Sequence, residues 1–367
     1  MYRNFTWPRC KNYRGLQLKV SVLTPGKLII LGEYAVLEGA HALVAAINRY
    51  AKVEITNANS NYYELKTDYL PISSIKFKFD AQGKILFIPE MRVNQRDTIK
   101  FFIETCESSL KFLQLYNKSI TPCTIVLDTS QFYNKVGDSK LGLGSSAALT
   151  VALFTALAKF AGFLVSKSVL FFNALKIHNR AQGGMGSGID IAASVFGGVL
   201  DYKMSLEKKV LPKNRQILED IHIVPIWSGQ STSTKHYLTQ LNAFREKNQQ
   251  SYKRIMHRLI ELANSGCYAY KTKNHTNFMH IITDYYGTLM HLGEESGLAI
   301  ISHEHRSISK IVKDAGGVYK PSGAGGGDLG LAFCPSKQIV KNVRSAINKS
   351  KYRIIDLQIT DQGVQVY

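Results

Sequence analysis

The sequence has few cysteines, which makes a disulfide-stabilised or zinc-stabilised protein a poor explanation of this chain. Its five cysteines (Cys10, Cys106, Cys123, Cys267 and Cys334) are scattered and form no C-x-x-C pair. This pattern argues against a disulfide framework or a zinc site and favours a reducing compartment. The N-terminus also lacks the apolar segment of a secretory signal. We therefore expect a cytoplasmic protein.

Long hydrophobic runs are also scarce, and the chain shows no internal repeat or low-complexity segment. One stretch, residues 142–165, is strongly apolar, but it contains Lys159 and begins with glycines and serines. A buried helix explains this stretch better than a membrane span does. We expect no membrane partner.

Acidic residues are few beside basic ones, with 27 Asp and Glu against 46 Lys and Arg and a formal net charge of +19. A nucleic-acid-binding protein usually gathers its basic residues on one face with aromatic residues between them. Here the basic residues are spread along the chain, and the densest cluster, Lys337 to Arg353, is typical of the solvated face of a helix. The distribution favours a general positive field that attracts small polyanions, and we expect no nucleic-acid partner.

A chain of 367 residues is long enough for two packed domains. We expect an N-terminal extension over residues 1–18, a first domain over 19–210 and a second over 211–367, separated by the polar stretch 203–219. The fold class expected is α/β (α+β). Strands are predicted at 18–23, 27–31, 43–47 and 51–56, with a turn at 24–26, and helices at 96–116, 168–181, 235–264, 275–293 and 303–315.

Glycine is concentrated in two places. The first is Gly142-Leu143-Gly144-Ser145-Ser146-Ala147-Ala148, which leads into the apolar helix, predicted to start at Ser146. Glycines allow backbone N–H groups to turn toward an anion, and the helix adds its positive end. The alternative is a simple turn in which a serine caps the helix.

The second glycine-rich segment is Pro321-Ser-Gly-Ala-Gly-Gly-Gly-Asp328, which has more glycines than a β-turn needs. It suits a backbone pressed against a ligand or against another glycine loop; the alternative is a flexible hairpin tip. A third motif, Thr24-Pro-Gly-Lys27, continues to Gly32-Glu33-Tyr-Ala-Val36. Lys27 in an apolar strand needs an anionic partner if it is buried, or else it extends to water at the strand end.

Together and in this order, the three motifs resemble the signature of the superfamily of galactokinase, homoserine kinase, mevalonate kinase and phosphomevalonate kinase (GHMP). The resemblance covers about residues 20–357. It implies a two-domain kinase fold, with an N-terminal domain like ribosomal protein S5 and a C-terminal ferredoxin-like α+β domain. It also implies a phosphotransferase that uses ATP and Mg²⁺ and acts on a small phosphorylated molecule.

Within the superfamily, the segments 178–193, 227–234 and 320–328 resemble the phosphomevalonate kinase branch, which converts 5-phosphomevalonate to 5-diphosphomevalonate on the mevalonate route to isoprenoids. Mevalonate kinases commonly carry a magnesium-binding glutamate eleven residues before the catalytic aspartate, and Asn179 occupies that place here. This departure leaves the magnesium ligands open. The alternatives are a mevalonate kinase or another GHMP small-molecule kinase, a ligand-sensing homologue without catalysis, and a diphosphomevalonate decarboxylase.

The resemblance also implies residue roles. Residues 142–148 would hold the ATP phosphates, with Ser146 as a Mg²⁺ ligand. Lys27 and Asp190 would act at the acceptor oxygen, with Asp190 alternatively serving only as a helix N-cap. The residues expected to bind the substrate are Glu33, Arg180, Ser187, Ser231, Gly325 and Gly326. His178 could equally be a packed core histidine, and the sequence leaves the oligomeric state open.

Overall fold

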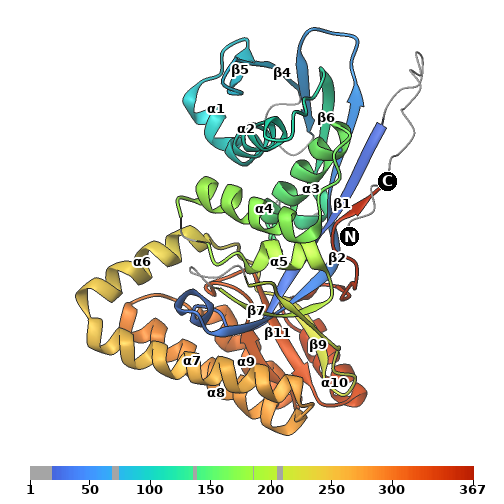
Figure 1. Cartoon of the computed structure of the whole chain (residues 1–367). Helices are drawn as coiled ribbons and strands as arrows, with labels where there is room; N and C mark the ends of the chain where they lie inside the picture. The colour runs from blue at the N-terminus through green and yellow to red at the C-terminus, as the bar shows by residue number, and fades with distance from the viewer. Residues whose placement is uncertain (1–18, 68–73, 135–138, 185, 205–209) are drawn as a thin grey trace, which may run out of the picture.

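The computed structural model describes residues 19–67, 74–134, 139–184, 186–204 and 210–367. The expected N-terminal extension, residues 1–18, lies outside these ranges. Two sheets organise the chain, and helices pack against each of them (Figure 1). The mixed α/β class expected from the sequence is confirmed.

In the part of the chain that the structure describes, the first sheet has nine strands, in the order β13-β1-β2-β6-β3-β4-β5, with β7 paired to β2 and β8 to β7. Among these described strands only β3 and β6 pair in parallel. The strands are β1 (Lys19–Leu31), β2 (His41–Asn57), β3 (Tyr63–Thr67), β4 (Ser74–Phe79), β5 (Ile85–Ile88), β6 (Cys123–Asp128), β7 (Val199–Lys203), β8 (Lys213–Arg215) and β13 (Gln365–Val366).

Helices cover this sheet, and the apolar stretch predicted to form a buried helix becomes α3, which packs on β1 and β2. The helices of this half are α1 (Val93–Thr98), α2 (Lys100–Gln114), α3 (Ser145–Phe160), α4 (Lys167–Gln182) and α5 (Ile189–Phe196). Among the described residues, no helix is long and apolar enough to cross a membrane.

The second sheet is antiparallel, in the order β10-β11-β9-β12, and its helices include the hairpin of α7 and α8. The strands are β9 (His222–Trp227), β10 (Val318–Pro321), β11 (Leu329–Cys334) and β12 (Arg353–Ile354), and the helices are α6 (Thr234–Lys247), α7 (Gln249–Lys271), α8 (His275–Ser296), α9 (His303–Asp314) and α10 (Lys337–Asn348). The helix predicted at 235–264 is divided at Asn248 into α6 and α7.

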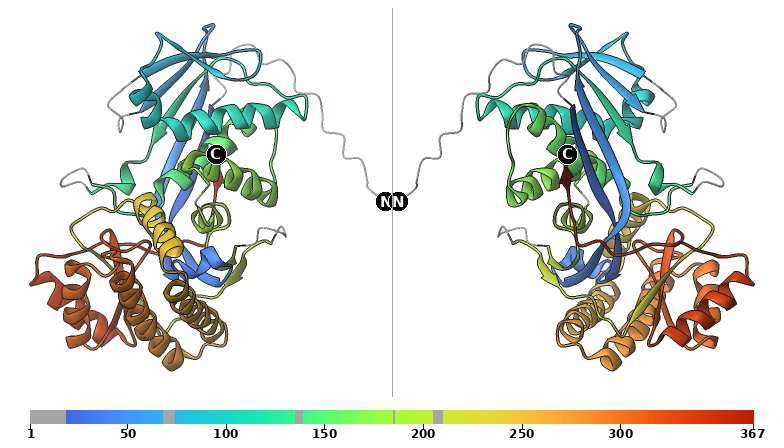
Figure 2. Two further views of the ribbon diagram at one scale, coloured as in Figure 1. Left: turned by 90° about the vertical axis from the view of Figure 1, so that its left-hand side faces the viewer. Right: turned by 90° about the vertical axis from the view of Figure 1, so that its right-hand side faces the viewer.

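Strands β1 and β2 are longer than the sequence predicts and run from the first sheet down to the second half (Figure 2). The turn expected at 24–26 is wrong, because both strands continue through a register shift where Pro25 pairs with Tyr50 and Gly26 with Ile47. A bulge accommodates a proline within a strand. Successive residues of β1 then serve both cores: Ile29 packs in the first, and Leu28 in the second.

The end of the chain returns to the first sheet. Strand β13 pairs with β1, with Val366 opposite Val22. Strand β8 also lies beyond residue 210 and pairs with β7. Two segments of the expected second domain therefore add strands to the first sheet, and the division at residue 210 stays a prediction.

Candidate active site

The glycine turn before α3 is shaped by backbone conformations that favour glycine. Gly142 and Gly144 have φ angles of 71° and 81°, which side-chain-bearing residues rarely adopt. Gly144 is the N-cap residue and no side chain caps the helix, so α3 begins at Ser145, one residue before the prediction. The alternative of a serine cap is therefore wrong, and the N–H groups of the first turn are left for another acceptor.

Lys27 lies beside this turn and is buried. Its Nζ donates to the carbonyl oxygen of Gly142 at 3.2 Å, and its backbone N–H donates to the carbonyl oxygen of Leu143 at 2.9 Å. A Cβ atom at Gly144 would lie 3.1 Å from Lys27 Cγ and 3.7 Å from Asp190 Cβ. The three residues are therefore close neighbours, although their motifs are far apart in the sequence.

Asp190 comes from the first turn of α5, whose N-cap residue is Gly188. The alternative in which Asp190 caps the helix is therefore wrong. Its carboxylate lies at the positive end of the helix, which stabilises a negative charge. Within the described residues, no ion pair of 4 Å or less joins Asp190 to Lys27. Both side chains thus remain open to a group placed between them.

His178 on α4 is buried behind the turn and contacts Ser146. Its Nε2 lies 3.1 Å from Ser146 Oγ and 3.4 Å from Gln182 Nε2. Burial lowers the pKa of His178, while the charge of Asp190 opposes that shift. A neutral imidazole that bonds the Ser146 hydroxyl fixes the orientation of that hydroxyl at the start of α3.

The second glycine-rich segment is held against the end of β1 by buried polar contacts. Glu33 Oε1 and Lys320 Nζ form an ion pair of 2.5 Å, with side chains 2% and 0% exposed. Burial lowers the pKa of Lys320, and the charge of Glu33 opposes this. Ser322 Oγ accepts from the N–H of Ile29 and donates to its carbonyl oxygen, both at 3.0 Å. Tyr34 also donates its hydroxyl hydrogen to a carbonyl oxygen of this loop.

A cavity of about 360 Å³ lies between these elements and is lined from both halves of the chain. The two glycine-rich segments both reach it, as the sequence suggested. Nine of the predicted site residues line it: Lys27, Glu33, Gly142, Leu143, Gly144, Ser145, Ser146, Ser187 and Asp190.

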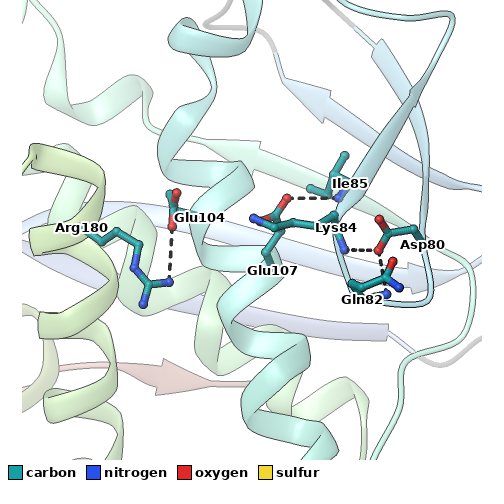
Figure 3. A network of polar contacts seen from close by, with 7 residues as sticks. All are labelled: Asp80, Gln82, Lys84, Ile85, Glu104, Glu107 and Arg180. Carbon is teal, nitrogen blue, oxygen red and sulfur yellow. Dashed lines mark hydrogen bonds and ion pairs between the residues drawn. The ribbon is translucent and has the colours of Figure 1, made fainter.

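Other predicted residues are not among those that line the cavity. Ala147 and Ala148 are buried within α3. The Arg180 side chain is 63% exposed, and its guanidinium lies 3.8 Å from Glu104 (Figure 3). Ser231 is exposed.

Gly325 and Gly326 belong to the second glycine-rich segment, but they pack against other residues of the second half and are not among those that line the cavity. A Cβ atom at Gly325 would collide with the carbonyl group of Ile300, and one at Gly326 with the ring of Tyr237. The N–H of Gly326 donates to the carbonyl oxygen of Ile300 at 2.9 Å. These glycines let the loop approach its own half of the chain closely.

Sequence reasoning overlooked several residues that the structure brings to the cavity. Lys100 starts α2, Lys235 lies on α6, and Asp328 ends the second glycine segment. Burial raises the pKa of Asp328 to about 6, and the Thr232 N–H and the charge of Lys27 both oppose this. The available signal was an acidic residue after three glycines; nothing local marked the two lysines.

The donor set suits a metal ion carried by a nucleotide better than a metal centre built by the protein. Among the described residues, no group of three or more His, Cys, Asp or Glu could hold a metal ion. Mg²⁺ in phosphate-transfer sites takes most of its ligands from phosphates and water and needs one or two from the protein. Ser146 Oγ and the Asp190 carboxylate line the cavity and fit that role.

Comparison with known proteins matches one part of the chain to a known domain family. Residues 110–198, which include the glycine turn, α3, α4 and α5, match the family of GHMP kinases N terminal domain. The chain carries a GHMP kinase N-terminal domain. This domain indicates a phosphotransferase and confirms the superfamily resemblance seen in the motifs.

Similar proteins match this chain over most of its length. A phosphomevalonate kinase of Streptomyces sp. strain CL190 is 26% identical over 334 residues, covering 84% of this chain and 88% of the relative. A mevalonate kinase of Thermococcus sibiricus is 29% identical over 365 residues, covering 95% and 98%. The Streptococcus pneumoniae phosphomevalonate kinase in complex with phosphomevalonate and AMPPNP superposes with a TM-score of 0.76 at 20% identity, covering 92% and 99%. The chain therefore has the GHMP kinase fold.

Proposed function

We propose that this protein transfers the γ-phosphoryl group of ATP to 5-phosphomevalonate and forms 5-diphosphomevalonate. The observation that carries this proposal is the balance of charge around the cavity. Among the described residues, four lysines line it: Lys27, Lys100, Lys140 and Lys235. The negative charge of the lining carboxylates is partly offset, because Glu33 pairs with Lys320 and burial raises the pKa of Asp328. A cavity with an excess of cations suits two phosphorylated ligands.

The nucleotide is assigned to the turn before α3. Its N–H groups and the helix end would accept the phosphates, and Mg²⁺ bound to ATP would supply charge neutralisation there. The relative crystallised with AMPPNP supports a nucleotide as one ligand of this fold. Ser146, oriented by His178, would hold the metal from the protein side.

The acceptor is assigned to the space beside Lys27 and Asp190. A phosphate monoester has its second pKa near 6, so most of it is already ionised at pH 7 and needs little help from a base. Lys27 would offset the repulsion between the two phosphoryl groups, and Asp190 would orient the acceptor. Asn179 supports this acceptor, since the mevalonate kinase pattern has a glutamate there. Roles for Ser187, Ser231, Arg180, Gly325 and Gly326 in substrate binding remain predictions.

Mevalonate is the second candidate acceptor. The observation that favours it is the mevalonate kinase of Thermococcus sibiricus, which is similar along 95% of this chain. A free hydroxyl must lose its proton during transfer, and Asp190 beside Lys27 would then be the base. The two acceptors therefore require different roles of Lys27 and Asp190: a phosphate acceptor needs mainly the positive charge of Lys27, and a hydroxyl acceptor needs Asp190 as a base.

A direct test measures ADP release with mevalonate, 5-phosphomevalonate and 5-diphosphomevalonate, and identifies the products by mass. We expect kcat/KM for 5-phosphomevalonate to exceed that for mevalonate by about a hundredfold or more, because phosphate-binding cations are left unpaired by the smaller ligand. The Lys27→Met variant is the control for contaminating kinases. A preference for mevalonate, release of CO₂ from 5-diphosphomevalonate, or no turnover with any acceptor would each overturn the proposal and favour one of the alternatives.

A further inference from the structure

Asp328 has a left-handed backbone conformation, which a glycine at this position would adopt at a lower energetic cost. It follows Gly325-Gly326-Gly327 and has a φ angle of 54°. Residues with a side chain rarely adopt positive φ, although aspartate tolerates it better than most. A side chain in such a strained conformation, at the edge of a ligand cavity, indicates that the carboxylate has a function there.

Three hydrogen bonds fix Asp328 to the segment after β9. Its N–H donates to the carbonyl oxygen of Gln230 at 2.6 Å, and its carbonyl oxygen accepts from the N–H of Ser228 at 3.0 Å. Its Oδ1 accepts from the N–H of Thr232 at 3.2 Å. These contacts with the second half of the chain fix the orientation of the Asp328 side chain.

This side chain meets the glycine turn of the first half. A Cβ atom at Gly142 would lie 2.6 Å from both Cγ and Oδ2 of Asp328, so the carboxylate occupies the space over that glycine. The carbonyl oxygen of the same glycine accepts from Lys27 Nζ at 3.2 Å. Asp328 and Lys27 thus lie on one residue of the turn, and their charges attract.

We propose that Asp328 is a positioning residue for Lys27. Its carboxylate lies over the Gly142 turn, and its negative charge attracts the Lys27 ammonium toward that turn, at the junction of the two glycine-rich segments. Other charged residues that line the same cavity include Asp190, Lys140 and Glu33, and the Glu33 carboxylate pairs with Lys320. The inference rests on the proposed function, because it assumes that Lys27 acts in phosphoryl transfer.

Two substitutions separate the charge of Asp328 from its shape. Asp328→Asn keeps the size, the acceptor for Thr232 and the tolerance of positive φ, but removes the charge. Asp328→Gly relieves the backbone and removes the side chain. We expect kcat to fall about tenfold in both variants, while KM for the acceptor changes less than about twofold. Asp284→Asn, a side chain 58% exposed on α8, is the matched control and should retain full kcat.

A double-mutant cycle with Lys27→Met decides whether Asp328 acts through Lys27. In the Lys27→Met background, Asp328→Asn should lower kcat no further. Wild-type kcat in Asp328→Asn, or a full additional loss in the double variant, would overturn the inference. The assays use whichever acceptor the wild type phosphorylates fastest, so a wrong acceptor affects only the proposed function.

A second measurement does not depend on turnover. If the two charges hold each other in the free enzyme, the shift of the urea unfolding midpoint in the double variant should be smaller than the sum of the two single shifts. Strictly additive shifts would overturn the inference even if no acceptor were phosphorylated.

Discussion

Lys27 is a buried cation, and among the described residues its Nζ donates one hydrogen bond, to the carbonyl oxygen of Gly142. An ammonium group in such a place is costly unless further anionic groups lie near it. Asp328 and Asp190 supply negative charge in its surroundings without a close ion pair. Phosphoryl groups placed in the cavity would complete the coordination of Lys27, which is why this residue is expected to dominate the chemistry.

Replacing Lys27 should therefore impair the reaction more than replacing Asp190. With 5-phosphomevalonate as acceptor, Lys27→Met loses a charge-assisted contact worth about 3 kcal/mol, which lowers kcat by about a hundredfold. Asp190→Asn keeps the size and much of the hydrogen bonding, so its loss should be smaller. Steady-state kcat at saturating substrates measures both, and ATP binding should persist in each variant. If Asp190→Asn were the less active enzyme, the acceptor would be a hydroxyl group.

At the scale of elements, the glycine-rich loop after β10 owes its position to β1. The Lys320–Glu33 pair and the Ser322 bonds to Ile29 join residues that are nearly 300 positions apart. Tyr285 on α8 adds a hydrogen bond of 2.6 Å from its hydroxyl to the carbonyl oxygen of Glu33. The contacts clamp the two motifs on either side of the cavity.

Breaking this clamp should destabilise the protein. Lys320→Met leaves the Glu33 carboxylate buried without its cation, and we expect the free energy of unfolding to fall by about 3–5 kcal/mol. Urea denaturation followed by circular dichroism measures this change. Lys310→Met, at an exposed position on α9, should change it by less than about 0.5 kcal/mol. Adding Glu33→Gln to Lys320→Met should recover part of the loss, and no recovery would contradict the ion-pair explanation.

At the scale of the whole molecule, β1 connects the two halves. One end of β1 pairs with the C-terminal strand β13, and its other end carries Lys27 between the two cores. The N–H of Tyr367 donates to the carbonyl oxygen of Ser21 at 2.8 Å, and the reverse bond is 3.1 Å. The last residues of the chain thus complete the edge of the first sheet far along the strand from the cavity.

Removing residues 364–367 should lower stability with little effect on catalysis. The truncation exposes the edge of β1 and loses several backbone hydrogen bonds, each worth about 1 kcal/mol net, so we expect a loss of about 2–4 kcal/mol. Kcat at 25 °C should stay within about twofold of the wild type. Val366→Ala keeps these backbone bonds and alters a side chain 42% exposed, so its unfolding midpoint should hardly move. An unchanged midpoint in the truncated protein would show that β13 contributes nothing.

The sequence by itself predicted the parts of the site that depend on local chemistry. The glycines at 142 and 144 indicated a tight turn before a helix, and the structure gives both a positive φ. For Lys27 in an apolar strand the sequence left two possibilities, a buried cation or a side chain that extends to water, and the structure buries it. Hydrophobic periodicity placed most helices to within a few residues, but the helix predicted at 96–116 is interrupted at Ile99, and the one at 235–264 is divided at Asn248 and continues to Lys271. These features follow from backbone sterics and side-chain period, which act over a few residues.

Only the tertiary structure decided which distant residues meet. Nothing in the sequence indicated that Lys320 pairs with Glu33 or that Asp328 lies over Gly142. Nor did the sequence indicate that Arg180, predicted to bind the substrate, lies 3.8 Å from Glu104. It also divided β1 at Pro25, because a proline and a glycine usually mark a turn, whereas pairing with β2 on one side and two cores on its faces keep the strand continuous. Local preferences of this kind are worth about 1 kcal/mol each, and they yield when burial and strand pairing across the whole fold favour another conformation.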